Sequence, residues 1–193
     1  MRLVLATRND HKVAELARLM PGVALEALPT GIVLPPEGEE SYAANALGKA
    51  RAAAAALGRP AVADDSGIEA AALGGAPAVR SARFAGPDAT DAQNLARLRA
   101  EAPAGSGLRY VCVMAYATPD GEERTFTGTC AGTLAAEERG TGGFGYDPAF
   151  LPAEPPAAGR TMAELDPAEK DAISHRGRAA RALLAWLTQG EAP

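Results

Sequence analysis

Two adjacent carboxylates, Asp64 and Asp65, stand at the end of a short apolar run and are followed by Ser66 and Gly67. The run predicts the end of a buried strand, and the glycine predicts a sharp turn after it. Carboxylates this close raise each other's pKa, so we expect a positive charge beside them. Asp, Ser and Gly are also common turn residues, and a solvated turn is the alternative interpretation.

A second polar segment, residues 7–12, lies between a predicted strand and a helical pattern. A turn from strand to helix presents backbone N–H groups and the positive end of the helix dipole, which together favour an anion. Thr7 and Asn9 can hydrogen-bond such an anion, and Lys12 can reach it from the first helical turn. The alternative is a helix cap, at Asn9 or Asp10, beside a surface lysine.

A third segment, residues 140–145, contains four glycines and Phe144. Glycine loses much conformational entropy when it is ordered, so this density favours a close approach of the backbone to a ligand. Phe144 offers a flat ring on which a nucleobase can stack. A flexible hairpin tip is the alternative interpretation.

Lysine is rare in this chain: 16 of the 19 basic residues are arginines, and the three lysines are Lys12, Lys49 and Lys170. A lysine supplies a compact charge that the planar arginine fork does not replace, which favours a specific role for each. His175 and Arg176 begin the last predicted helix, where cations oppose the helix dipole. That position favours an anionic or acceptor-rich partner over a simple helix cap.

Helices and strands share the chain in an order that predicts an α/β fold with a mixed sheet. We expect one domain over residues 1–193, with two lobes, the second formed mainly by the central β-rich part. The expected strands are residues 3–6 and 23–28 and the hairpin 109–117 and 122–132, and the expected helices are 13–20, 41–57, 90–101 and a last helix buried through Ala179, Leu183, Trp186 and Leu187.

Composition excludes several classes of protein. A net charge of −5 argues against a partner that is a nucleic acid polymer. No run approaches the ~20 apolar residues that cross a membrane, and the first residues do not resemble a signal peptide, so we expect a cytoplasmic protein. Cys112 and Cys130 lie in apolar segments and are expected to be buried free thiols.

These segments together suit a nucleoside triphosphate, and an acidic protein that binds this anion needs a divalent cation such as Mg²⁺. In the order and spacing of its motifs, from Leu3 to about Leu187, the chain resembles the inosine triphosphate pyrophosphatase family. That family includes the bacterial pyrophosphatases that act on non-canonical purine nucleotides.

The resemblance implies a role for each motif. Thr7, Asn9 and Lys12 match the family's phosphate-binding turn, and Lys49 and Ser66 match substrate contacts. Glu37 and Asp65 match its metal ligands, and Asp65 is also the implied catalytic general base, although Asp64 remains an alternative proton acceptor. The residues implied to recognise the base are Phe144, Gly145, Tyr146, Asp147, Lys170, His175 and Arg176.

Two positions depart from the family pattern. Arg8 stands where many bacterial relatives have glycine, and we expect it to add a cation over the phosphate turn as a further substrate contact. Ala44 replaces an acid that commonly precedes the helix asparagine, here Asn45, which removes one possible outer contact to the metal.

The resemblance further implies an elongated mixed sheet, with the site in a cleft between two lobes, and a homodimer. The expected reaction is Mg²⁺-dependent hydrolysis of ITP, dITP or XTP to the monophosphate and pyrophosphate. Donors aimed at the 6-oxo group, from His175 or Arg176, should reject the 6-amino group of ATP. The alternatives are a Maf-like pyrophosphatase for modified pyrimidine nucleotides and a nucleotide-binding module without catalysis.

Overall fold

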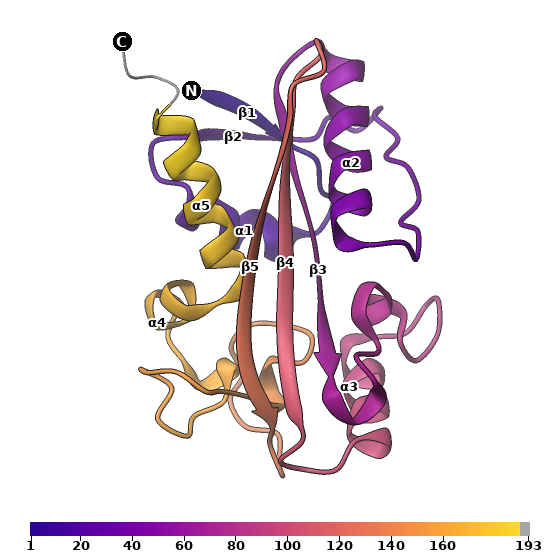
Figure 1. The fold of residues 1–193 in the computed structure, drawn as a ribbon, viewed down its shortest axis with the longest axis vertical. Helices are drawn as coiled ribbons and strands as arrows, with labels where there is room; N and C mark the ends of the chain where they lie inside the picture. The colour runs from indigo at the N-terminus through magenta and orange to yellow at the C-terminus, as the bar shows by residue number, and fades with distance from the viewer. Residues whose placement is uncertain (190–193) are drawn as a thin grey trace. The chain divides into compact units, whose positions relative to one another are not determined.

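The computed structural model describes residues 1–189 and contains a six-stranded mixed sheet in the order β2-β1-β3-β4-β5-β6 (Figure 1). Strand β1 pairs in parallel with β2 and β3, and β5 pairs antiparallel with β6. The predicted α/β class is therefore confirmed.

The strands are β1 (Arg2–Leu5), β2 (Ala24–Ala27), β3 (Ala61–Ala70), β4 (Gly107–Ala117), β5 (Glu123–Leu134) and β6 (Phe150–Pro152). The helices are α1 (Asp10–Leu19), α2 (Tyr42–Leu57), α3 (Asp91–Glu101), α4 (Pro167–Ile173) and α5 (His175–Gln189).

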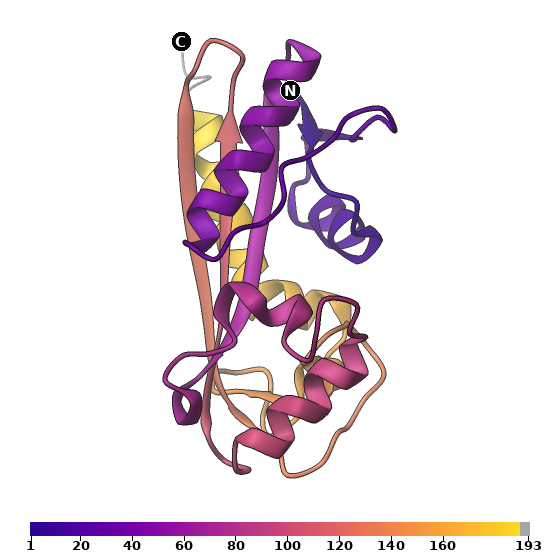
Figure 2. The ribbon, with the colours of Figure 1, turned by 90° about the vertical axis from the view of Figure 1, so that its right-hand side faces the viewer.

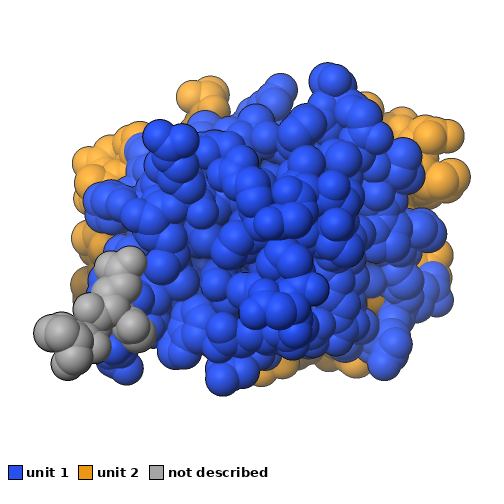
Figure 3. Space-filling view, turned by 90° about the horizontal axis from the view of Figure 1, so that it is seen from above, with its two compact units in different colours: residues 1–65, 112–128, 176–193 blue, residues 66–111, 129–175 orange. Residues whose placement is uncertain are grey.

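The chain forms two compact units, which Figure 3 distinguishes by colour. Unit 1 contains residues 1–65, residues 112–128 and the chain from residue 176 onward, and unit 2 contains residues 66–111 and 129–175. Each unit has a hydrophobic core of its own, because each core cluster draws its residues from one unit.

The strands of unit 1 bury both faces. Val62 in β3 packs with apolar residues of α1 and α5, whereas its neighbours Ala61 and Ala63 pack with those of α2. Successive residues of a strand point to opposite faces, so α2 covers one face and α1 and α5 cover the other. Figure 2 shows α2 and α5 on opposite sides of these strands.

The core of unit 2 is a single cluster. It joins the end of β3, the start of β4 and the end of β5 to α3 and to the segment from Tyr146 to Ile173. Both cysteines of the chain are buried free thiols, Cys112 in unit 1 and Cys130 in unit 2, as predicted. Within residues 1–189, no helix combines the length and apolar character needed to cross a bilayer.

Local signals placed the helix ends correctly. Ser41 caps α2, which ends at Gly58 in the left-handed conformation with φ 62°. Thr90 forms a capping box at the start of α3, and Asn9 caps α1. The predicted hairpin is also present, as β4 and β5.

The turn predicted after Asp65 is wrong. Strand β3 continues without interruption from Ala61 to Ala70, through both aspartates and Gly67. The two acids are tolerated inside a buried strand because each finds cationic or amide partners, as described below. A sequence segment rich in turn-forming residues is here held extended by tertiary contacts.

Candidate active site

Asp64 and Asp65 face opposite sides of β3. Asp64 lies on the side of α1 and α5, where it meets Lys12 and Arg176. Asp65 lies on the side of α2, where it meets Asn45 and Lys49. Two neighbouring carboxylates are thus separated by the sheet itself, and each has partners of its own.

The Asp64 carboxylate is the centre of a buried ion-pair network. Its Oδ2 atom lies 3.0 Å from Lys12 Nζ and 3.2 Å from a terminal nitrogen of Arg176, and Asp64 is 1% exposed. Burial would raise the pKa of Asp64, but the charges of Lys12, Arg176 and Lys49 outweigh it and hold the pKa well below its usual value. Asp64 is therefore ionised at neutral pH.

Glu15 completes this network, and sequence reasoning missed it. Its Oε2 atom accepts a hydrogen bond from Arg176 at 2.5 Å, and the residue is 7% exposed. The available signal was its position three residues after Lys12, which places both on one face of α1. Sequence analysis grouped Arg176 with the base-recognition residues, whereas the structure places its guanidinium on Glu15 and Asp64.

The Asp65 carboxylate has a different environment. Asn45 Nδ2 donates to its Oδ2 at 2.9 Å, and Lys49 Nζ lies 3.9 Å from its Oδ1. Burial raises the pKa of Asp65; Lys49 opposes this shift, and Glu37 adds to it. The two aspartates consequently have pKa values displaced in opposite directions, an arrangement typical of acid–base sites.

Lys49 joins Asp65 to Glu37. Its ammonium donates to Glu37 Oε1 at 2.6 Å and to the Asp64 carbonyl oxygen at 2.7 Å. Burial would lower the pKa of Lys49, but the charges of Asp64, Glu37 and Asp65 raise it above its usual value. One cation thus lies against two carboxylates that come from distant segments of the sequence.

Asn45 fixes the loop that carries Glu37. It donates to the Gly38 carbonyl oxygen at 3.1 Å and accepts from the Gly38 N–H at 2.8 Å, while it also holds Asp65. Sequence analysis named Asn45 only as the helix asparagine beside Ala44 and gave it no role. Its exposed fraction of 7% is unusual for a helix asparagine, and these three bonds satisfy the buried amide.

The turn between β1 and α1 combines the two interpretations of its sequence. Thr7 Oγ1 accepts from the Asn9 N–H at 3.2 Å, and Asn9 Oδ1 accepts from the Lys12 N–H at 3.1 Å, so Asn9 is the helix cap. The lysine is not a surface residue, however, because the Lys12 side chain is only 13% exposed and points to Asp64.

In unit 2, Asp147 is the centre of a second buried cluster. Its carboxylate accepts from Lys170 at 2.8 Å, from the Tyr110 hydroxyl at 2.9 Å and from the Phe144 N–H at 3.1 Å. Lys170 Nζ also lies 5.3 Å from the centre of the Phe144 ring. Sequence reasoning missed Tyr110 because its position in the sequence is that of an ordinary strand residue.

His175 belongs to the same cluster. Its ring stacks on Tyr110 with the centroids 4.5 Å apart and the planes 7° from parallel. The structure thus brings together four of the residues expected to recognise a base, namely Phe144, Asp147, Lys170 and His175.

The other predicted contacts occupy supporting positions. Tyr146 is 5% exposed and donates to the Ser81 carbonyl oxygen at 2.7 Å, and the Gly145 N–H donates to Asp91 at 2.8 Å. Ser66 follows Asp65 in β3 and is half-buried.

The glycine segment is shaped by its own neighbours. A Cβ at Gly143 would lie 2.0 Å from Asp147 Oδ2 and 3.0 Å from Lys170 Nζ, and a Cβ at Gly140 would lie 2.4 Å from the Ala163 backbone. At these two glycines the backbone lies close to the protein itself, and the expected approach to a ligand stays a prediction. The loop lies directly against the Asp147 cluster.

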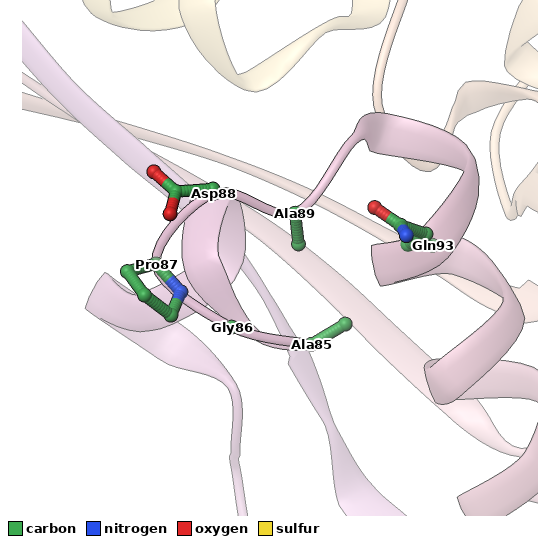
Figure 4. A pocket seen from close by; sticks show the side chains of 6 residues that line it. All are labelled: Ala85, Gly86, Pro87, Asp88, Ala89 and Gln93. Atoms are coloured by element: carbon green, nitrogen blue, oxygen red, sulfur yellow. The ribbon is translucent and has the colours of Figure 1, made fainter.

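A cavity of about 330 Å³ lies elsewhere in unit 2 (Figure 4). Its lining offers one carboxylate, one amide and no cationic side chain, which does not suit a polyphosphate. The lining residues are Ala85, Gly86, Pro87, Asp88, Ala89 and Gln93.

The donor set around Lys49 suits a hard divalent cation. Among the described residues, no group of three His, Cys, Asp or Glu side chains is arranged to hold an ion. Glu37 and Asp65 offer hard carboxylate oxygens beside a single cation. Mg²⁺ characteristically takes one or two carboxylates and fills its other positions with water and substrate phosphates. The two residues fit that pattern.

Comparison with known proteins places these features in context. A model of the Ham1 family matches residues 3–186. A dITP/XTP pyrophosphatase of Frankia alni is 47% identical, and the alignment covers 98% of each chain. One of Cutibacterium acnes is 44% identical and covers 95% of this chain and 94% of the relative. The structure of a HAM1 protein from Coxiella burnetii is 40% identical, with a TM-score of 0.82 and coverage of 98% and 99%.

Proposed function

We propose that this protein, which belongs to the Ham1 family, hydrolyses non-canonical purine nucleoside triphosphates to the monophosphate and pyrophosphate. The observation that carries the proposal is the buried set of charges around Asp64 and Asp65. Its expected substrates are ITP, dITP and XTP, whose removal cleanses the nucleotide pool of deaminated purines.

The charges of unit 1 suit a magnesium-bound triphosphate. Three cations, Lys12, Lys49 and Arg176, are paired with four carboxylates in the network. Their formal sum is close to neutral and slightly negative, so a divalent cation is needed before a polyanion is attracted. The four carboxylates are Glu15, Glu37, Asp64 and Asp65.

Glu37 and Asp65 would hold Mg²⁺, with Asn45 orienting both the Asp65 carboxylate and the Glu37 loop. When bound, the metal neutralises phosphate charge and lowers the pKa of a water. The residues of this chain then act by position and charge, as in other phosphoryl-transfer sites.

Asp65 is the proposed proton acceptor for the attacking water. Its raised pKa makes it the better base of the two aspartates, since Asp64 is held ionised by Lys12 and Arg176. The proposed role of Asp64 is to orient Lys12 toward the phosphates and to keep Arg176 in place.

Thr7, Asn9, Lys12 and Lys49 would bind the phosphates. The turn offers a hydroxyl and the N-terminal end of α1, and the two ammonium groups can stabilise the leaving pyrophosphate. Both lysines are largely buried, which strengthens their interaction with an anion.

The cluster of unit 2 would bind the base. Phe144 offers a ring for stacking, and Lys170 and His175 offer N–H donors that a 6-oxo group accepts. The 6-amino group of adenine is itself a hydrogen-bond donor. It would face the N–H donors of Lys170 and His175 and would offer these buried groups no acceptor. A penalty of this kind supports strong rejection of ATP.

The test is a panel of triphosphates with the purified protein, Mg²⁺ and a pyrophosphate assay. ITP, dITP and XTP should give kcat/KM values at least 100-fold above those for ATP, GTP and modified pyrimidine nucleotides. Equal turnover of ATP and ITP would refute the proposed specificity. Preference for a pyrimidine would favour the Maf-like alternative, and nucleotide binding without pyrophosphate release would favour a binding module.

A further inference from the structure

We propose that Arg8 is a positioning residue that fixes the loop carrying Glu37, and that its charge is not used to bind phosphate. The inference rests on the proposed function in one respect, namely that Glu37 holds the metal. It departs from the sequence expectation, in which Arg8 added a cation over the phosphate turn.

The contacts of the Arg8 guanidinium are all with backbone carbonyls of one segment. One terminal nitrogen donates to the Leu28 oxygen at 3.0 Å, and the other donates to the oxygens of Pro29 and Ile32 at 2.8 and 2.9 Å. A planar fork with several N–H groups can serve three acceptors at once, whereas a lysine ammonium at the end of a flexible stem does not reproduce that geometry.

The segment needs such support. Residues 28–41 form no helix or strand between β2 and α2, and Val33 in their middle is 88% exposed. The contacts described for Asn45 and Gly38 tie down the far end of the loop. Arg8 ties down the near end, so Glu37 is carried by a loop that is fixed on both sides.

The position of Arg8 in the sequence gives this contact a functional meaning. Arg8 lies between Thr7 and Asn9, the side chains proposed to hold phosphate. One side chain therefore connects the turn proposed for phosphate with the loop proposed for the metal. Loss of the connection should weaken metal binding more than it weakens phosphate binding.

The experiment compares three variants. Arg8→Lys keeps the charge and removes the fork, and Arg8→Ala removes both. Arg124→Lys is the matched control, because Arg124 is exposed in β5 and pairs with Glu122. The first readout is hydrogen exchange in metal-free protein, without any substrate. The amides to follow are those of Ile32 and Gly38, which donate to the Pro29 oxygen and to Asn45 Oδ1.

If Arg8 positions the loop, R8K and R8A both speed exchange of these amides by about tenfold or more, and R124K does not. Both should also raise the Mg²⁺ concentration that gives half-maximal activity, by about five- to tenfold, with a smaller change in the KM for ITP at saturating Mg²⁺.

Two results would overturn the proposal. One is unchanged exchange in both Arg8 variants, and the other is a KM defect in R8A that R8K fully restores, which would assign Arg8 to phosphate binding. Failure of the proposed function is distinguishable, because faster exchange in an inactive protein would retain the role of Arg8 and reject only the proposed reaction.

Discussion

Lys49 donates a hydrogen bond to Glu37 at 2.6 Å, joining a helix to a loop without regular structure. The same ammonium lies 3.9 Å from Asp65 Oδ1, so it separates two carboxylates that would otherwise repel each other.

Replacing Lys49 with methionine should therefore impair both catalysis and the stability of the metal-free protein. It should lower kcat/KM for ITP by about 100- to 1000-fold, through loss of a charge beside the phosphates. It should also lower the Tm of the metal-free protein, and Mg²⁺ should raise that Tm more than it raises the wild-type Tm. Arg51→Met is the control on the same helix, since Arg51 is exposed and pairs with Glu123. An unchanged response to Mg²⁺ would contradict the shared role of Lys49.

The two aspartates should respond differently to loss of charge. Asp64→Asn leaves Lys12 without its buried carboxylate and Arg176 with Glu15 alone, and it should lower the free energy of unfolding by about 3–5 kcal/mol. Asp65→Asn should leave the free energy of unfolding unchanged or raise it, yet lower kcat by about a thousandfold or more. Urea unfolding and steady-state kinetics measure both. Near-normal activity of D65N would remove Asp65 from the role of base.

Asp64 and Asp65 should also make opposite contributions to the pH dependence of the free energy of unfolding, measured with EDTA present. The folded-state pKa of Asp64 lies below its usual value of 3.8, so its stabilisation is complete above that pH and is lost as the pH falls toward the folded pKa. The folded-state pKa of Asp65 lies above 3.8, so its contribution is lost as the pH rises from 3.8 through the folded pKa. D64N should remove the loss of stability at low pH, and D65N should remove the loss of stability as the pH rises above 3.8. The prediction is contradicted if the free energy of unfolding depends on pH in the same way in both variants.

Tyr110→Phe tests the Asp147 cluster of unit 2, which is proposed to bind the base, by removing only the Tyr110 hydroxyl. It removes the hydrogen bond to Asp147 and keeps the ring that stacks on His175. Loss of one donor to a buried carboxylate should lower kcat/KM for ITP by about tenfold, mostly through KM. Tyr116→Phe is the control, because Tyr116 packs edge-on against Trp186 in unit 1. Equal effects of the two substitutions would show that only packing is involved.

Gly143→Ala and Gly145→Ala separate crowding from backbone strain. Both glycines have positive φ, 72° and 64°, so each alanine carries a similar strain of about 1 kcal/mol. Only at Gly143 does the new Cβ meet Asp147 and Lys170, while nothing lies within 4 Å of it at Gly145. We expect G143A to raise the KM for ITP by tenfold or more relative to G145A. Similar KM values would place Asp147 and Lys170 outside base recognition.

Much of the fold could be predicted because its signals are local. Ser41, Gly58 and Thr90 mark helix ends through hydrogen bonds to their own neighbours, and the hairpin alternates along its strands. The prediction of a turn after Asp65 was wrong because the partners that hold Asp64 and Asp65 in a strand come from α1, α2 and α5. These contacts are distant in the sequence and leave no local signal.

The candidate site residues came mainly from the family resemblance, and their roles stay predictions. The resemblance named Glu37, Lys49 and Asp65, which the structure brings together. Glu15 had only its spacing of three residues from Lys12 as a signal, and Tyr110 had none that separates it from an ordinary strand tyrosine. The single two-lobed domain, the homodimer and the cytoplasmic location stay predictions.

The continuity of β3 has a consequence for anyone who re-engineers this protein. Asp64 and Asp65 are distinguished by the face of β3 on which each side chain lies, so deleting Ala63 would turn both side chains to the opposite face. Asp65, the proposed base, would then occupy the position beside Lys12 and Arg176, and Asp64 would face α2 one position away from the place that Asp65 now occupies. Along this stretch of β3 the number of residues must therefore be kept.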